Sequence, residues 1–278
     1  MIPSLPFEMV MKIMELSYYA HADSMSVDVE TLGACAAVCK EWSTFARKLL
    51  FFEVVLKLDL KTKGAILLLN AGRLGACIRS LTVDAIWKPD VGDPNFIDVL
   101  SYCPALYQLD LYLHSRILEL TTLEVSRLIA LPVAISALRF RSYNEQESHV
   151  LYQLMAIWPT IQFLALDVNK YALAPPPAER PPFSLYELRI NQILPAESVM
   201  RWLLPPIPTG QSGSLRILST TLLEDLAFTE YAPYVRALAV SCRFSRNAVL
   251  LAPFNALEEL FLDDIDFAAS KFDTREDP

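Results

Sequence analysis

The stretch of sequence that decides the fold reads Cys103-Pro104-Ala105-Leu106-Tyr107-Gln108-Leu109-Asp110-Leu111. Its proline ends any helix that precedes it, because the ring clashes with a helical backbone and removes an N–H donor. The three leucines then follow the spacing apolar-x-x-apolar-x-apolar, and the period of two at its end is typical of a strand with one buried face. The stretch therefore predicts a proline stop followed by a short strand.

The same spacing occurs nine times from residue 55 onward. Successive starts lie 23, 28, 29, 26, 24, 30, 20 and 22 residues apart, and most of these intervals match or approach the period of roughly 20 to 29 residues of leucine-rich repeats. The nine segments are Val55-Leu58-Leu60, Ile78-Leu81-Val83, Leu106-Leu109-Leu111, Ile135-Leu138-Phe140, Ile161-Leu164-Leu166, Leu185-Leu188-Ile190, Leu215-Leu218-Thr220, Val235-Leu238-Val240 and Leu257-Leu260-Leu262.

A proline precedes the spacing closely in six of the nine segments, which chance matches in an apolar chain would not supply. Helix-like stretches lie upstream of several of these prolines, as at Phe96-Val99-Leu100. The repeating unit is therefore helix, proline stop and short strand, and such units must stack because none can bury its apolar face alone. The six prolines are Pro104, Pro132, Pro159, Pro182, Pro233 and Pro253.

The segment from Cys103 to Leu111 resembles the Cys-Pro-x-Leu-x-x-Leu-x-Leu segment of leucine-rich repeats that often follow an F-box. The resemblance implies an α/β fold for residues 55–278: an irregular leucine-rich-repeat-like solenoid with parallel strands on the concave side and helices on the convex side. The spacing is irregular, and the seventh unit ends in Thr220 instead of an aliphatic residue.

The first fifty residues predict two amphipathic helices. The first helix is expected to begin at about Pro6, because proline is tolerated in the first turn of a helix. Met9, Ile13 and Leu16 form an apolar stripe along it. Thr31 is a plausible N-cap for a second helix. The apolar residues of that helix are Cys35, Val38, Trp42, Phe45 and Leu49.

The residue string of this region resembles the F-box motif, especially the forms common in fungal proteins. It reads Leu5-Pro6-x-Glu8-Met9-x3-Ile13-x2-Leu16, then Leu32-x5-Val38-Cys39-Lys40-x-Trp42, with a longer link between the two parts than is usual. The resemblance implies an F-box-like helical module in residues 1–54 that binds the Skp adaptor and, through it, a cullin scaffold. The residues divided between that contact and the module's own core would be Leu5, Pro6, Met9, Ile13, Leu16, Val38 and Trp42.

Charge and hydropathy exclude several other partners. With 24 basic and 32 acidic residues the net charge is −8, which repels nucleic acid and anionic lipid. The apolar run from Leu128 to Leu138 is too short to span a bilayer and contains Pro132. The first twenty residues do not resemble a secretory signal. We therefore expect a cytoplasmic or nuclear protein with no nucleic-acid or membrane partner.

Catalytic and metal-binding patterns are missing from the sequence. The five cysteines form no C-x-x-C pair and predict reduced, buried, small apolar side chains. The three histidines lie far apart, and the seven glycines form no phosphate cradle. We expect no metal, no cofactor and no enzymatic activity. The proline-rich stretch 174–182 is expected to be a spacer between units, with a ligand for an aromatic groove as the alternative.

If the strands are placed correctly, the residues that alternate with the core point outward on the concave surface. Beside Gln108 they are Asp110, Tyr112, Arg139, Arg141, Asp167, Glu187 and Arg189. They are candidates for binding a target protein, the alternative being an ordinary solvated face. The two resemblances together imply a substrate-receptor subunit of an SCF-type ubiquitin ligase, whose target the sequence does not name. The alternative is a leucine-rich-repeat scaffold without a ubiquitin role.

Overall fold

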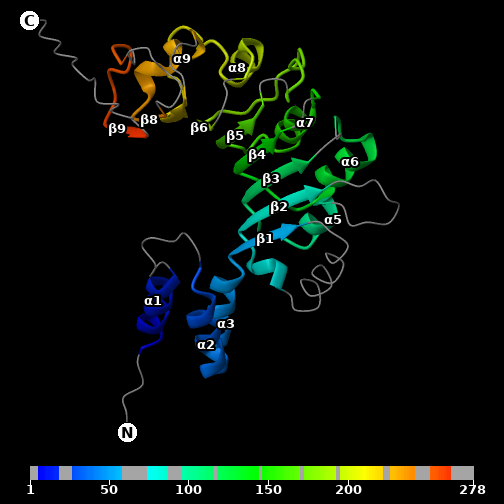
Figure 1. Ribbon diagram of the computed structural model, residues 1–278, viewed down its shortest axis with the longest axis vertical. Helices are drawn as coiled ribbons and strands as arrows, with labels where there is room; N and C mark the ends of the chain where they lie inside the picture. The colour runs from blue at the N-terminus through cyan, green and yellow to red at the C-terminus, as the bar shows by residue number, and fades with distance from the viewer. Residues whose placement is uncertain are drawn as a thin grey trace, which may run out of the picture.

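Short helices at the N-terminus lead into a single parallel sheet (Figure 1). The structure is a computed structural model. It describes residues 6–18, 27–57, 74–86, 96–114, 118–143, 146–169, 172–191, 195–221, 226–241 and 251–263.

The N-terminal module contains helices α1 (Phe7–Tyr18), α2 (Val29–Val38) and α3 (Lys40–Leu50). Helix α1 begins directly after Pro6, as predicted. The prediction of one helix from Thr31 to Leu49 is wrong, because Cys39 is extended (φ −159°, ψ 171°) and separates α2 from α3. The N-cap is Asp28, whose carboxylate accepts a hydrogen bond from the Thr31 N–H at 2.9 Å.

The small core of this module lies between its three helices. Val10 and Met14 of α1 are buried against Leu32 of α2 and Ala46 of α3. The aromatic residues Trp42 and Phe45 are partly buried and pack against this cluster. Because the helices are short, this shared burial stabilises them more than their intrinsic propensity does.

Within the described residues the sheet has nine strands, all parallel and following one another in chain order from β1 to β9. The predicted single parallel sheet is therefore confirmed. The strands are β1 (Glu53–Lys57), β2 (Ser80–Ile86), β3 (Gln108–His114), β4 (Ala137–Ser142), β5 (Phe163–Val168), β6 (Glu187–Ile190), β7 (Ile217–Thr220), β8 (Ala237–Ser241) and β9 (Glu259–Asp263).

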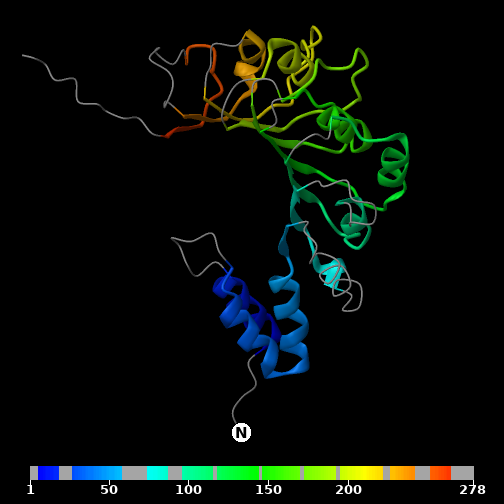
Figure 2. The ribbon, with the colours of Figure 1, turned by 45° about the vertical axis from the view of Figure 1, so that its right-hand side comes forward.

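The described helices that connect the strands lie on one side of the sheet, on the outside of its curve (Figures 1 and 2). The opposite face of the strands carries no helix in the described part of the chain. We call it the open face. The connecting helices are η1 (Leu74–Cys77), α5 (Phe96–Ser101), α6 (Thr122–Ala130), α7 (Val150–Ile157), α8 (Glu197–Leu203), α9 (Leu226–Tyr231) and η2 (Ala232–Tyr234).

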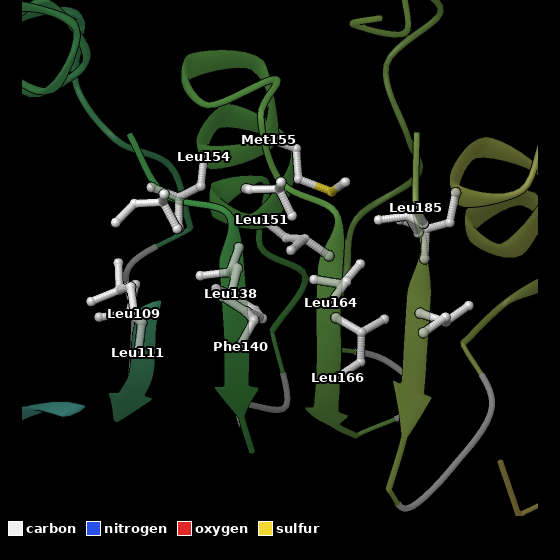
Figure 3. Packing of buried hydrophobic residues seen from close by; sticks show 14 of the residues in the cluster. Leu109, Leu111, Leu138, Phe140, Leu151, Leu154, Met155, Leu164, Leu166 and Leu185 are labelled. Atoms are coloured by element: carbon white, nitrogen blue, oxygen red, sulfur yellow. The ribbon is translucent and has the colours of Figure 1, made fainter. Parts of the chain in front are cut away.

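The register aligns one leucine from each unit across the sheet. These leucines pair strand to strand from β2 to β9, and the residues two positions later, apolar except for Thr220 of β7, form a second row. Both rows point toward the helices, where Leu151, Leu154 and Met155 of α7 pack onto them (Figure 3). The first row is Leu81, Leu109, Leu138, Leu164, Leu188, Leu218, Leu238 and Leu260.

The same backbone joint connects each unit to the next. One carbonyl just before a strand accepts the N–H groups of two consecutive residues of the following unit, as Tyr107 does from Ser136 and Ala137 at 2.9 and 3.0 Å. Because this joint satisfies two donors at every step, it fixes the register at the start of each strand. The accepting residues are Phe52, Arg79, Tyr107, Ser136, Gln162, Tyr186, Arg216 and Arg236.

The prediction for the first unit is wrong, because β1 pairs with β2 in a different register from the one that the predicted triplet requires. Val54 and Leu56 of β1 pair with Leu81 and Val83, so they hold the core positions. Val55 is on the open face and is 62% exposed. A shift of one residue turns every side chain of a strand to the other face, so Val55 cannot belong to the predicted triplet. The remaining two predicted residues, Leu58 and Leu60, lie outside the described residues.

The connection between β5 and β6 contains no helix among its described residues. Its first part is buried: the Tyr152 hydroxyl donates to the Ala174 carbonyl at 2.7 Å. Arg180 donates to the carbonyls of Trp202 and Leu203 at the C-terminal end of α8. Its guanidinium lies 3.9 Å from the centre of the Phe183 ring. The proline-rich stretch thus lies between two units, as expected, and is attached to both neighbouring helices.

The prediction that the cysteines are buried holds for Cys103 and fails for Cys39, which is exposed at the break between α2 and α3. Cys35 and Cys77 are intermediate, and Cys242 lies outside the described residues. Burial raises the pKa of the Cys103 thiol to about 11.

A thiol whose pKa is raised stays protonated and unreactive until the pH approaches that value. Iodoacetamide at about pH 8.5, the ordinary pKa of a cysteine, should therefore alkylate Cys39 and leave Cys103 unmodified in the native protein. Peptide mass mapping checks this, and a denatured sample, in which both residues react, is the control. Equal labelling of both residues in the native protein would contradict the placement of Cys103.

Two glycines form a matched pair for testing the packing. A Cβ atom at Gly75 would lie 1.8 Å from the Tyr102 carbonyl oxygen, whereas one at Gly33 of α2 meets nothing within 4 Å. Gly75→Ala should lower the free energy of unfolding by about 3 kcal/mol through overpacking. Gly33→Ala should raise it by about 0.5 to 1 kcal/mol, because alanine favours a helix. Urea denaturation measures both, and a Gly75→Ala variant of unchanged stability would refute the close approach.

Candidate docking surfaces

The α1 helix presents an apolar stripe to solvent. Met9, Ile13 and Leu16 are 54%, 49% and 61% exposed, while Val10 and Met14 face the module's core. Both sets recur at helical spacing, so periodicity alone does not decide which set is buried. Of the predicted adaptor-binding residues, these three therefore lie on the outer surface of α1.

The other predicted adaptor-binding residues are divided between surface and core. Pro6 is exposed before α1, and Val38 is exposed at the end of α2. Trp42 of α3 packs against the core cluster. Leu5 lies outside the described residues.

A hollow of about 310 Å³ continues the exposed stripe at the end of α1. Besides Leu16 it is lined by Lys12, Glu15, Tyr18, Leu49 and Phe52. The sequence pattern does not indicate Tyr18 or Phe52 as part of this surface. The helical spacing of Lys12, Glu15 and Leu16 places them together, but Phe52 arrives there only through the packing of α3.

The open face of the sheet gathers the predicted target-binding residues on four neighbouring strands. Gln108, Asp110 and Tyr112 come from β3, and Arg139 and Arg141 from β4. The remaining residues are Asp167 on β5 and Glu187 and Arg189 on β6. Strict alternation places all of them opposite the leucine rows.

Asp110 and Arg141 form a partly buried, two-bond ion pair on this face. Arg141 Nε donates to Asp110 Oδ1 at 2.9 Å, and Nη2 donates to the other carboxylate oxygen. The bond is diagonal, because Asp110 lies beside Arg139 in the register. Burial lowers the pKa of Arg141, but the hydrogen bond and charge of Asp110 outweigh it, so the pKa is raised overall. Asp110 is only 6% exposed and therefore holds Arg141 in place instead of meeting solvent.

Asp167 is the second buried carboxylate of the face. It lies 4.0 Å from Arg139 Nη2 and accepts a hydrogen bond from the Tyr143 hydroxyl. Burial and then this hydrogen bond raise the pKa of Tyr143 above its ordinary value. The Tyr143 ring meets the Tyr112 ring edge to face, with centroids 5.4 Å apart. The end of β3 to β5 is thus a packed polar cluster.

A hollow of about 520 Å³ lies beside this cluster, over the starts of β3 to β6. Its floor includes Ala165, and its charged lining residues are Arg139, Arg189 and Glu187. Glu187 pairs with Arg189 on the same strand. We call this hollow the arginine hollow. Its aromatic residues Tyr107, just before β3, and Phe163, the first residue of β5, carry no predicted role from sequence.

Within the described residues, no three His, Cys, Asp or Glu side chains are grouped so that they could hold a metal ion. Across the same part of the chain, no helix has the length and apolar character needed to cross a membrane.

Comparison with known proteins finds no match to any family model, and no curated protein is significantly similar in sequence.

The Asp110–Arg141 pair should contribute measurably to stability. Asp110→Ala leaves a partly buried guanidinium unpaired and should lower the free energy of unfolding by about 2 kcal/mol. The double variant Asp110→Ala/Arg141→Ala should lose clearly less than the sum of the two single variants, as measured by a double-mutant cycle in urea.

The exposed pair Glu197–Arg201 of α8, with atoms 2.6 Å apart, is the matched control. Its coupling should be no more than about 0.5 kcal/mol. Equal coupling energies in the two cycles would contradict the special role of the open-face pair.

Proposed function

We propose that this chain is a substrate-receptor subunit of an SCF-type ubiquitin ligase. In this proposal the N-terminal module is an F-box that docks a Skp-type adaptor, and through it a cullin. The observation that carries the proposal is the exposed stripe of Met9, Ile13 and Leu16 on a helix whose other apolar residues already fill the core. Such an apolar face on a three-helix module is typical of a protein interface.

The proposal further takes the sheet as a leucine-rich-repeat-like solenoid. Three features support it: the sheet is all parallel, its strands follow chain order, and one backbone joint is repeated at every step. Stacked units of this kind offer a long surface to a partner. In this proposal the open face, with its paired arginines, holds the target protein.

The chain would act by positioning. The adaptor at α1 and the target at the open face would be held on one polypeptide, which raises the effective concentration of the target near the transfer subunits. Ubiquitin transfer itself would occur on those subunits. A ligase of this kind would work in the cytoplasm or the nucleus.

Introducing charge into the stripe tests the adaptor contact. Ile13→Lys with Leu16→Lys should abolish recovery of the Skp adaptor in a pull-down, because a lysine buried in an interface loses hydration without compensation. The melting temperature should stay unchanged, since both side chains are exposed.

The matched control is Leu123→Lys on α6, an apolar residue that is 71% exposed outside the module. It should leave adaptor recovery intact. Met14→Lys, which charges the buried side of the same helix, should instead lower the melting temperature. If the unaltered chain binds no Skp adaptor, the ubiquitin role fails and a leucine-rich-repeat scaffold takes its place.

A further inference from the structure

The arginine hollow has a regular geometry that the register creates. Arg139, Ala165 and Arg189 occupy one row on β4, β5 and β6. Adjacent strands lie about 4.8 Å apart, so the backbones that carry the two arginines are about 10 Å apart. Because the Ala165 side chain between them is small, it does not fill the space above the sheet at this point of the hollow. Two guanidinium groups therefore flank a space that no side chain of the row fills.

The two arginines keep donors that the folded chain does not use fully. Arg139 Nε is buried and has no hydrogen-bond partner among the described residues, and its ion pair to Asp167 is long, at 4.0 Å. The side chain of Arg189 is 57% exposed and pairs with Glu187 through Nε. By contrast, the guanidinium of Arg141 already donates two hydrogen bonds to the Asp110 carboxylate.

An apolar end adjoins the charged part of the hollow. Phe163 precedes Ala165 by two residues on the same strand and is 37% exposed. Its ring packs against the Tyr186 ring with centroids 5.8 Å apart. Two residues along a strand span about 6.6 Å, which is the spacing of alternate side chains in an extended peptide.

We propose that the arginine hollow binds an extended acidic segment of a target protein. The segment would place an Asp or Glu carboxylate between Arg139 and Arg189. An aromatic or aliphatic side chain two positions away would lie against Phe163. Arginine favours carboxylates because its planar fork donates two parallel hydrogen bonds. The inference rests on the proposed function only in taking the open face as the target-binding surface.

Charge balance selects a carboxylate over a phosphate. The lining holds two arginines and the carboxylate of Glu187, which leaves one net positive charge, and Asp167 lies close behind Arg139. A phosphate group carries nearly two negative charges at neutral pH, so it meets repulsion from both carboxylates. A single carboxylate matches the net charge of the lining.

Fluorescence anisotropy with the full-length chain alone tests the inference. The probes are labelled peptides, identical apart from one residue placed two positions after a phenylalanine: glutamate, glutamine, lysine or phosphoserine. The glutamate peptide should bind about tenfold or more tightly than the glutamine peptide, as expected for a charge-assisted hydrogen bond. Arg139→Gln with Arg189→Gln should remove that preference.

Two further variants control for folding and for general charge. Ala165→Glu places a carboxylate of the chain itself between the arginines, so it should fold stably and abolish peptide binding. Arg201→Gln removes an exposed arginine from the helix side and should bind the glutamate peptide normally.

Equal affinity for the glutamate and glutamine peptides would overturn the inference, as would undiminished binding by Ala165→Glu. Preference for the phosphoserine peptide would overturn the choice of a carboxylate. Because no adaptor is present, these results are independent of the adaptor pull-down, so the two proposals fail separately.

Discussion

The whole sheet depends on one row of leucines that the register holds in line. Each unit contributes a short strand and one crossover, too little to bury its own apolar residues. Leu109 becomes buried only because Leu81 and Leu138 lie on either side of it. The repeated joint, in which one carbonyl accepts two N–H groups, sets the start of each strand so that the leucines meet. Parallel stacking in chain order follows from these two constraints.

The same register decides the chemistry of the open face. A slip of one residue by β3 would turn Asp110 to the helix side, and the same slip by β4 would turn Arg141 there; either slip buries one charge and leaves the other without its partner. The free-energy penalty of breaking this ion pair in a misregistered sheet is therefore larger than the stability that the pair adds to the correct sheet. The row of Arg139, Ala165 and Arg189 exists for the same reason. Core and surface are thus specified by one alignment.

The sequence predicts the sheet well because its signal is repeated, and it predicts single elements less well. Seven of the nine segments have their core residues buried where expected. At β9, Leu260 and Leu262 take the expected register but are 40% and 45% exposed. At β1 the alternatives Val54–Leu56 and Val55–Leu58 both look apolar, and only pairing with β2 decides between them. Likewise, the i, i+4 spacing of Met9 and Ile13 equals that of Val10 and Met14. Burial of Asp110 and Asp167 was beyond sequence reasoning, because it depends on arginines of a neighbouring strand.

The helical module and the sheet share a residue, which bears on how the proposed receptor would work. The Phe52 N–H donates to the Leu49 carbonyl in the last turn of α3, and the Phe52 carbonyl accepts from Arg79 and Ser80 in the first joint of the sheet. No flexible linker intervenes between α3 and β1. A receptor that acts by proximity benefits from such a connection, because a fixed orientation reduces the entropy lost when the target approaches the transfer subunits. The joint at Phe52 would then serve both the packing of the first unit and the orientation of a bound target.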